Sequence, residues 1–340
     1  FGLKEKNWHV NCKAVSASIA NLAVISGLLE PGQKILAMDL THGGHLSHGW
    51  QLPSGKPISL SSKIFKVSYY GVNKKTNLFG YNQILKIAKK FKPDLIISGG
   101  TAYARDINYK KMSVIAKAVG AYYLADIAHE AGLIAGRAIN SPFPYADVVT
   151  MSTQKTLRGP RGAIIICKKE LQEKIDKGIF PGLMGGPCDN VIAAIAVCLK
   201  EAQTGAFKKY TKQTIVNAKV LAQELKKYGF KIVTDGTDKH LFLIDLRNLP
   251  TGGKNINGHE AAVLLDKAGL VCNKNTVPYE TGTPMKPSGI RLGTPACTTR
   301  GMKEGEMKII AKWIYEVLVL NRKSEDVLKE VKQLTKRFKI

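Results

Sequence analysis

Through about residue 170, short apolar runs alternate with segments whose hydrophobic spacing is helical. The runs predicted to be strands are residues 34–39, 64–69, 94–98, 121–126, 147–151 and 162–167. Helices are predicted between them, for example over residues 19–29, 82–90 and 110–119. Strands that alternate with helices pair mostly in parallel, because each helix returns the chain to the start of the next strand. We therefore predict an α/β fold in which helices cover a mostly parallel, mixed sheet.

The C-terminal part of the chain has a different pattern. Helices are predicted over residues 190–204 and 208–228, and the tail carries two more over 303–320 and 324–338. Between them, short strands are predicted over 231–234, 240–245, 271–273 and 290–293, with a helix over 258–268. We place a domain boundary near Gly205, which gives a large domain of residues 1–204 and a smaller α+β domain of residues 205–340.

Two residues at the ends of predicted strands suggest a reaction centre. Asp126 ends one strand, and Lys155 follows another in a turn that contains Gly159 and Pro160. Ligands of parallel sheets bind beyond the carboxyl ends of the strands. A lysine there can lose its proton by desolvation and attack an aldehyde. Lys155 as the Schiff-base amine and Asp126 as partner of a pyridine nitrogen predict a pyridoxal phosphate (PLP) site.

Four further features fit such a site, and each also has a simpler interpretation. Small and hydroxyl residues, including Ala17 and Ser18, precede a predicted helix and could bind phosphate, although serine is also a common helix cap. His45 lies in a histidine-rich turn and could stack on a flat ring; without a nearby Cys or carboxylate, we predict no metal site. His129 could approach a phenolic oxygen or be structural. Arg291, flanked by apolar residues, suits a buried carboxylate-binding role better than a surface salt bridge.

Composition limits the remaining possibilities. The 340 residues carry a formal net charge of +25, which attracts anions, yet the lysines are spread along the chain and form no nucleic-acid-binding motif. No apolar run is long enough for a membrane span. The six cysteines are scattered, which is typical of reduced thiols in the cytoplasm. We expect a cytoplasmic protein without membrane or nucleic-acid partners.

Four segments, in this order, resemble the serine hydroxymethyltransferase family, and the resemblance runs from Ser16 to the C-terminus. They are His42-Gly43-Gly44-His45-Leu46, Asp126-Ile127-Ala128-His129, Lys155-Thr156-Leu157-Arg158-Gly159-Pro160-Arg161 and Gly289-Ile290-Arg291-Leu292-Gly293-Thr294-Pro295. The resemblance implies transfer of the serine hydroxymethyl carbon to tetrahydrofolate, which leaves glycine, with PLP as cofactor.

The resemblance also implies a role for each matching position. Lys155 would form the internal aldimine, Asp126 would pair with the pyridinium nitrogen, and Arg291 would bind the amino-acid carboxylate. The remaining cofactor contacts would come from Ala17, Ser18, His45, Thr101 and His129, and from Gly185 and Gly186 of a partner subunit. The positions implied at the folate site are Leu40, Gly44, Leu46, Asn275, Thr283, Pro284 and Met285. The family shares its active sites across a homodimer, so we expect a dimer or a tetramer.

The chain also departs from the family pattern. Residues resembling Tyr-Leu-Glu-Gly-Tyr-Pro-Gly, which supply a proton-handling glutamate and a tyrosine, would precede Phe1, so we expect a fragment of a longer protein. Gln154 replaces a histidine, Ala17 a glycine and Met184 a polar residue. Two alternatives stay open at this point. One is a PLP-dependent aldolase of β-hydroxy amino acids. The other is a non-catalytic RNA-binding or assembly protein.

Overall fold

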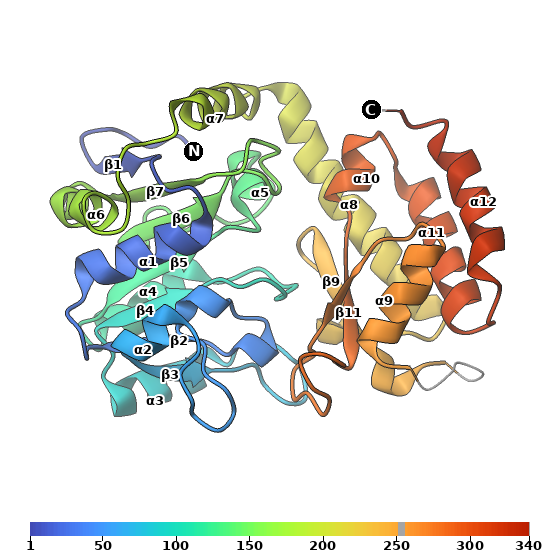
Figure 1. The fold of residues 1–340 in the computed structure, drawn as a ribbon, viewed down its shortest axis with the longest axis horizontal. Helices are drawn as coiled ribbons and strands as arrows, with labels where there is room; N and C mark the ends of the chain where they lie inside the picture. The colour runs from blue at the N-terminus through green and yellow to red at the C-terminus, as the bar shows by residue number, and fades with distance from the viewer. Residues whose placement is uncertain (251–255, 340) are drawn as a thin grey trace.

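The computed structural model describes residues 1–250 and 256–339, which build two sheets with their covering helices (Figure 1). The large sheet has seven strands in the order β1-β7-β6-β5-β4-β2-β3. Its strands are β1 (Trp8–Asn11), β2 (Lys34–Met38), β3 (Lys66–Tyr70), β4 (Leu95–Ser98), β5 (Tyr122–Asp126), β6 (Val148–Ser152) and β7 (Ala163–Lys168). Strands β3, β2, β4, β5 and β6 pair in parallel, whereas β7 runs antiparallel to both of its neighbours.

Helices cover both faces of the large sheet, and each face has its own apolar core. One core contains buried residues of α1 (Ala17–Leu28) and α6 (Gln172–Ile179), such as Val24 and Ile175. The other contains residues of α3 (Tyr81–Phe91) and α4 (Tyr109–Lys117), such as Ile84 and Met112. The central strands are buried on both faces, which explains why they read as continuous apolar runs. Three more helices complete this unit: the short helices α2 (Leu60–Ile64) and α5 (Ala131–Ala135), and α7 (Asp189–Glu201).

The small sheet is antiparallel, in the order β10-β11-β9-β8. It contains β8 (Lys231–Ile232), β9 (Leu241–Asp245), β10 (Asn273–Asn275) and β11 (Gly289–Gly293), with helices α9 (Gly258–Lys267), α10 (Pro295–Thr299), α11 (Glu304–Leu318) and α12 (Ser324–Thr335). The long helix α8 (Gly205–Lys227) runs between the two units (Figure 1). Phe207 and Tyr210 near its start belong to a large-sheet core, whereas Leu221 and Leu225 near its end belong to the small-sheet core.

The structure confirms the predicted fold class, and most predicted elements lie within two or three residues of the observed ones. Two of the predicted strands are each offset by two residues. The strand predicted over 271–273 begins only at Asn273, and the one predicted over 231–234 ends at Ile232 before a 3₁₀ turn, Val233–Asp235. Helix α8 begins at Gly205, and the domain boundary placed there stays a prediction. None of the helices within residues 1–250 and 256–339 has both the length and the hydrophobicity that crossing a bilayer requires.

Candidate active site

A cavity of about 690 Å³ opens between the two units, at the carboxyl end of the parallel strands. Lys155, which follows β6, lines it together with His129, which follows β5. The small-sheet unit contributes His240, which precedes β9, and Arg291, from the middle of β11. The volume lies within the range of sites that bind cofactors and small ligands. Three of the sequence-predicted residues, Lys155, His129 and Arg291, are therefore brought together by the fold.

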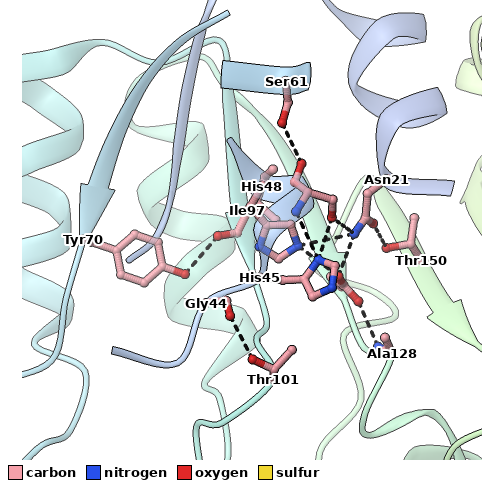
Figure 2. A network of polar contacts seen from close by, with 12 residues as sticks. Asn21, Gly44, His45, His48, Ser61, Tyr70, Ile97, Thr101, Ala128 and Thr150 are labelled. Carbon is pink, nitrogen blue, oxygen red and sulfur yellow. Dashed lines mark hydrogen bonds and ion pairs between the residues drawn. The ribbon is translucent and has the colours of Figure 1, made fainter. Parts of the chain in front are cut away.

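Asp126 lies beneath this region, only 5% exposed, at the end of β5. Its Oδ2 atom accepts hydrogen bonds from Asn21 Nδ2 at 2.7 Å and from His48 Nε2 at 2.9 Å. Its Oδ1 atom accepts the Ala128 backbone N–H at 2.9 Å. Figure 2 shows Asn21, His48 and Ala128 within one network of polar contacts. Burial alone would raise the pKa of Asp126, but the hydrogen bonds from His48 and Asn21, together with the electrostatic effect of His48 and His45, outweigh it, so the net pKa is lowered. The carboxylate therefore stays ionised.

The acceptor capacity of Asp126 fits a pyridinium ring. A carboxylate offers about four lone-pair positions, and the three hydrogen bonds from Asn21, His48 and Ala128 leave about one for a further N–H donor. At the cavity wall, Gln154 Oε1 and Arg300 Nε are buried and find no hydrogen-bond partner among the described residues. Such atoms are expected where a polar ligand completes the site. The residues present therefore fit PLP.

His45 occupies the 3₁₀-helical turn next to this network. Its Nδ1 lies 2.7 Å from Ser47 Oγ, and its ring centroid lies 5.6 Å from that of His48. Burial, followed by the charges of His48 and Lys155, lowers the pKa of His45 to about 4 against the opposing effect of Asp126, so the ring is neutral near pH 7. A neutral imidazole can stack on a cationic ring without charge repulsion.

The same cluster could also hold a metal ion, because one ligand atom from each of His45, His48 and Asp126 lies within 4.8 Å of the others. The sequence argument against a metal site relied on the absence of a carboxylate near the histidine-rich turn. That argument was incomplete, because the fold brings Asp126 to the turn from 78 positions away. Neutral histidines and a carboxylate are zinc ligands as well as PLP contacts, so the donor set alone does not separate the two.

Lys155 is held in a defined turn, since its carbonyl accepts the Arg158 N–H at 3.0 Å. Burial lowers the pKa of Lys155, while the charges of Asp126 and Glu130 act in the opposite direction and do not cancel the effect. Asp126 is therefore close enough to act electrostatically on the Lys155 amine. Such proximity is required if both residues are to contact one PLP ring. Thr156 Oγ1 donates to the His129 carbonyl at 2.8 Å, which ties the Lys155 turn to the segment after β5.

Arg291 has polar contacts but no acidic partner among the described residues. Its Nη1 donates to the Thr101 carbonyl at 2.7 Å, and its Nη2 donates to Asn273 Oδ1 at 3.2 Å. Burial lowers the pKa of Arg291, although a guanidinium stays charged at any physiological pH. A cation held by neutral groups beside a cavity is suited to an anionic substrate group. Thr101 is itself fixed, because its hydroxyl donates to the Gly44 carbonyl at 2.9 Å (Figure 2).

Ala17 and Ser18 form the first turn of α1, which Ser16 caps through its side chain. Ala17 lies one helical turn before Asn21, the residue that contacts Asp126, and a turn of α-helix rises about 5.4 Å. The free N–H groups of α1 therefore lie about one helical turn from the residue that contacts Asp126. Capping by Ser16 and phosphate binding are compatible, because a helix start has four free N–H groups.

The remaining predicted residues lie outside the cavity that Lys155 lines. Gly185 and Gly186 occupy an exposed loop between α6 and α7, and no described atom lies within 4 Å of where their Cβ atoms would be. The positions proposed for folate are spread over several loops: Leu40 and Leu46 lie in 3₁₀ turns, Asn275 ends β10, and Met285 is 71% exposed. Thr283 and Pro284 are exposed beside Met285, and Gly44 is buried beside His45.

Three polar residues of the site were not singled out from the sequence: Asn21, His48 and His240. Asn21 is a polar residue in an otherwise apolar helix, and this contrast was the only hint of its role in the sequence. The structure shows that its side chain is fully buried. His48 belongs to the histidine-rich turn, where the local pattern could not tell which imidazole reaches Asp126. His240 precedes β9, and its ring stacks on that of His129, with centroids 5.8 Å apart and planes 17° apart.

Comparison with known proteins identifies the family. The sequence pattern of the family described as "Serine hydroxymethyltransferase" matches residues 1–314. The chain belongs to this family. A curated serine hydroxymethyltransferase of Methanosarcina barkeri (strain Fusaro / DSM 804) is 50% identical over 337 residues, which cover 98% of this chain and 79% of that protein.

Family membership confirms the predicted activity. The chain is a PLP-dependent transferase of one-carbon metabolism, which interconverts serine and glycine with tetrahydrofolate as co-substrate. Neither the aldolase nor the RNA-binding alternative is favoured by these matches. The roles of individual residues, and the assembly of subunits, do not follow from the matches.

Proposed function

We propose that Lys155, Asp126 and Arg291 form the catalytic core of this serine hydroxymethyltransferase. The observation that carries the proposal is their arrangement: Lys155 and Arg291 line one cavity, and Asp126 ends β5, three residues before His129 in the same cavity wall. PLP, when bound, withdraws electrons from the amino-acid Cα and makes its bonds labile. The protein supplies the positions and the charges.

Each residue has a separate task in this proposal. Lys155 holds the cofactor covalently through its amine, which burial helps to keep unprotonated. Asp126 stays ionised and keeps the pyridine nitrogen protonated by charge pairing. Arg291 would bind the substrate carboxylate and so fix how the amino acid is oriented in the cavity. His45, His129 and Thr101 would help to hold the cofactor.

The phosphate and folate contacts belong to the same proposal. Ala17 and Ser18 bind the phosphate at the start of α1, where the helix dipole favours an anion. Gly185 and Gly186 reach the phosphate of a partner subunit, and their exposed loop leaves their backbone open for such a contact. The chain then works as a homodimer with shared sites or as a tetramer. Leu40, Gly44, Leu46, Asn275, Thr283, Pro284 and Met285 contribute to the folate site.

We place this activity in the cytoplasm. The six cysteines form no disulfide among the described residues, and free thiols are typical of a reducing compartment. Thiol titration of freshly lysed cells would test this placement, because oxidised cysteines in the native protein would contradict it.

An absorbance titration with PLP tests the catalytic assignment. The full chain should develop the absorption band of lysine-bound PLP near the visible edge, and Lys155→Ala should lack it. Lys168→Ala is a matched control, because Lys168 pairs with Asp147 at the end of β7 and does not line the cavity. A band that persists in Lys155→Ala would refute the role of this lysine. Serine cleavage that ignores tetrahydrofolate would refute the transferase assignment, and a PLP-loaded monomer in light scattering would refute the shared sites.

A further inference from the structure

A buried ion pair joins the two units behind the cavity. Lys239 Nζ lies 2.5 Å from Glu130 Oε1, and the two side chains are 1% and 2% exposed. Glu130 precedes α5 in the large-sheet unit, and Lys239 precedes β9 in the small-sheet unit. Desolvating two charges costs about as much free energy as their attraction returns, so burial of this pair is poorly explained by stability alone. None of the roles assigned above uses either residue.

Each residue of the ion pair is adjacent in sequence to a histidine that lines the cavity. Glu130 follows His129, and Lys239 precedes His240. The two rings stack nearly parallel, with their centroids 5.8 Å apart, and both line the cavity with Lys155. The ion pair and the ring stack therefore connect the same two segments side by side, and the ion pair fixes where one ring lies relative to the other.

The segment that contains Lys239 makes several polar contacts with the large-sheet unit. The Asp238 N–H donates to the Ala104 carbonyl at 3.1 Å, and Arg105 Nη1 pairs with Asp238 Oδ1 at 2.9 Å. Lys239 Nζ also lies 5.5 Å from the centre of the Tyr103 ring. These contacts anchor the segment from which the Lys239 side chain reaches Glu130.

The charges of the pair extend to the cavity. Glu130 opposes the burial that lowers the pKa of Lys155, and Lys239 adds to the burial that lowers the pKa of His240. The second carboxylate oxygen of Glu130, Oε2, is buried without a hydrogen-bond partner among the described residues. Glu130 is thus held by Lys239 and not by a wider network.

We propose that the Glu130–Lys239 ion pair is a positioning element for the reaction, which holds His129 against His240 in the cavity wall and fixes the small-sheet unit at the site. The inference rests on the proposed function in one respect, namely that this cavity receives the amino-acid substrate. Neither residue lines the cavity. Both act through the neighbouring histidines.

The test compares three variants of the full PLP-loaded chain: Glu130→Gln, Lys239→Met and the double variant. The singles should lower the melting temperature, because each leaves one buried charge unpaired, and the double variant should recover most of that loss. Its kcat/KM for serine should nevertheless stay roughly 10- to 100-fold low, as expected for misplaced site residues. Its PLP affinity, measured by absorbance, should stay within about threefold of the parent, a change below the tenfold that 1.4 kcal/mol produces.

Two controls separate positioning from stability. The exposed pair Lys177–Glu173, at 3.6 Å on α6, receives the matching changes Glu173→Gln and Lys177→Met, which should leave kcat/KM unchanged. Lys239→Arg keeps a cation opposite Glu130 and should retain more activity than Lys239→Met. A further readout needs no turnover: in histidine-labelled apo protein, the NMR signals of His129 and His240 should shift in the double variant and not in the control.

The outcomes are decisive in either direction. Recovery of both melting temperature and kcat/KM in the double variant would overturn the proposal and leave the pair a purely stabilising contact. Failure of the double variant to fold or to bind PLP would also overturn it, as would unmoved histidine signals. If instead the parent protein shows no lysine-bound PLP, the proposed function fails and not this inference.

Discussion

Replacement of Arg291 offers the sharpest test of the substrate site, because its effect can be worked out from its hydrogen bonds. A guanidinium has five N–H donors. Two are occupied, one by the Thr101 carbonyl and one by Asn273 Oδ1, so about three remain for a ligand. No carboxylate among the described residues pairs with Arg291. A substrate carboxylate can therefore take two charge-assisted hydrogen bonds without displacing an internal partner.

The two lost bonds set the expected size of the effect. A hydrogen bond to a charged group contributes about 1.5–3 kcal/mol, so Arg291→Ala should cost about 3–6 kcal/mol of serine affinity. At 1.4 kcal/mol per factor of ten, this corresponds to roughly a 100- to 10 000-fold higher dissociation constant. Arg291→Lys keeps the charge but loses the forked geometry, so its effect should be intermediate. PLP affinity should change far less in both variants.

The assay is a titration of PLP-loaded protein with serine and with glycine, followed by absorbance, beside a separate PLP titration of the apo protein. Arg158→Ala is the matched control and Arg300→Ala a comparison, because both arginines line the same cavity. The Arg158 guanidinium lies 4.0 Å from the centre of the Tyr210 ring, which occupies it elsewhere. Equal losses of serine and PLP binding in Arg291→Ala, or a larger serine defect in Arg300→Ala, would refute the reasoning.

Four other changes have expected outcomes. Asn21→Ala removes the donor to Asp126 and the acceptor of the Thr150 hydroxyl, so urea denaturation should show a loss of about 1–3 kcal/mol in unfolding free energy. Gly44→Ala would place a Cβ 2.2 Å from the Met38 carbonyl oxygen and should cost about 1–3 kcal/mol and weaken PLP binding through the adjacent His45. Gly185→Ala, with no described atom within 4 Å of that Cβ, should leave the melting temperature unchanged. Burial, the largest cause, lowers the pKa of His45 to about 4 and that of His240 to about 3, so protons bind the unfolded chain first. The unfolding free energy of the apo protein should fall as pH drops from about 6.5 to 4, by up to about 1.4 kcal/mol per pH unit for each histidine, and His240→Gln should flatten that fall.

The large sheet was predictable from the sequence because its strands are buried on both faces and its helices on one, so local periodicity reports the tertiary environment. The prediction failed where the local pattern of apolar residues does not reflect burial. Val271 was assigned to a strand because it is apolar and β-branched, yet it is 81% exposed at the cavity, and the strand begins two residues later. The strand β1 was missed because it is short, lies at the sheet edge and mixes polar with apolar residues.

The sequence indicated the residues of the candidate site only where a reactive side chain and its strand lie in one short segment. Lys155 and Asp126 each lie at a strand end, and parallel topology brings such ends together. The partners of Asp126 could not be found in the same way, because Asn21 lies 105 positions away in another element. Glu130 and Lys239 meet across 109 positions and two units, and nothing near either residue in the sequence indicates the other.

The site must satisfy two opposite electrostatic demands within one buried region. Burial disfavours charge, so it raises the pKa of Asp126 and lowers that of Lys155. PLP chemistry needs an ionised acid and a neutral amine, so only the effect on Asp126 has to be reversed. The fold does this selectively. It directs donors from Asn21, His48 and the backbone at Asp126, whereas the Lys155 amine makes no hydrogen bond or ion pair among the described residues. The ionised state of Asp126 and the lowered pKa of Lys155 thus depend on where hydrogen-bond donors are placed, and not on burial alone.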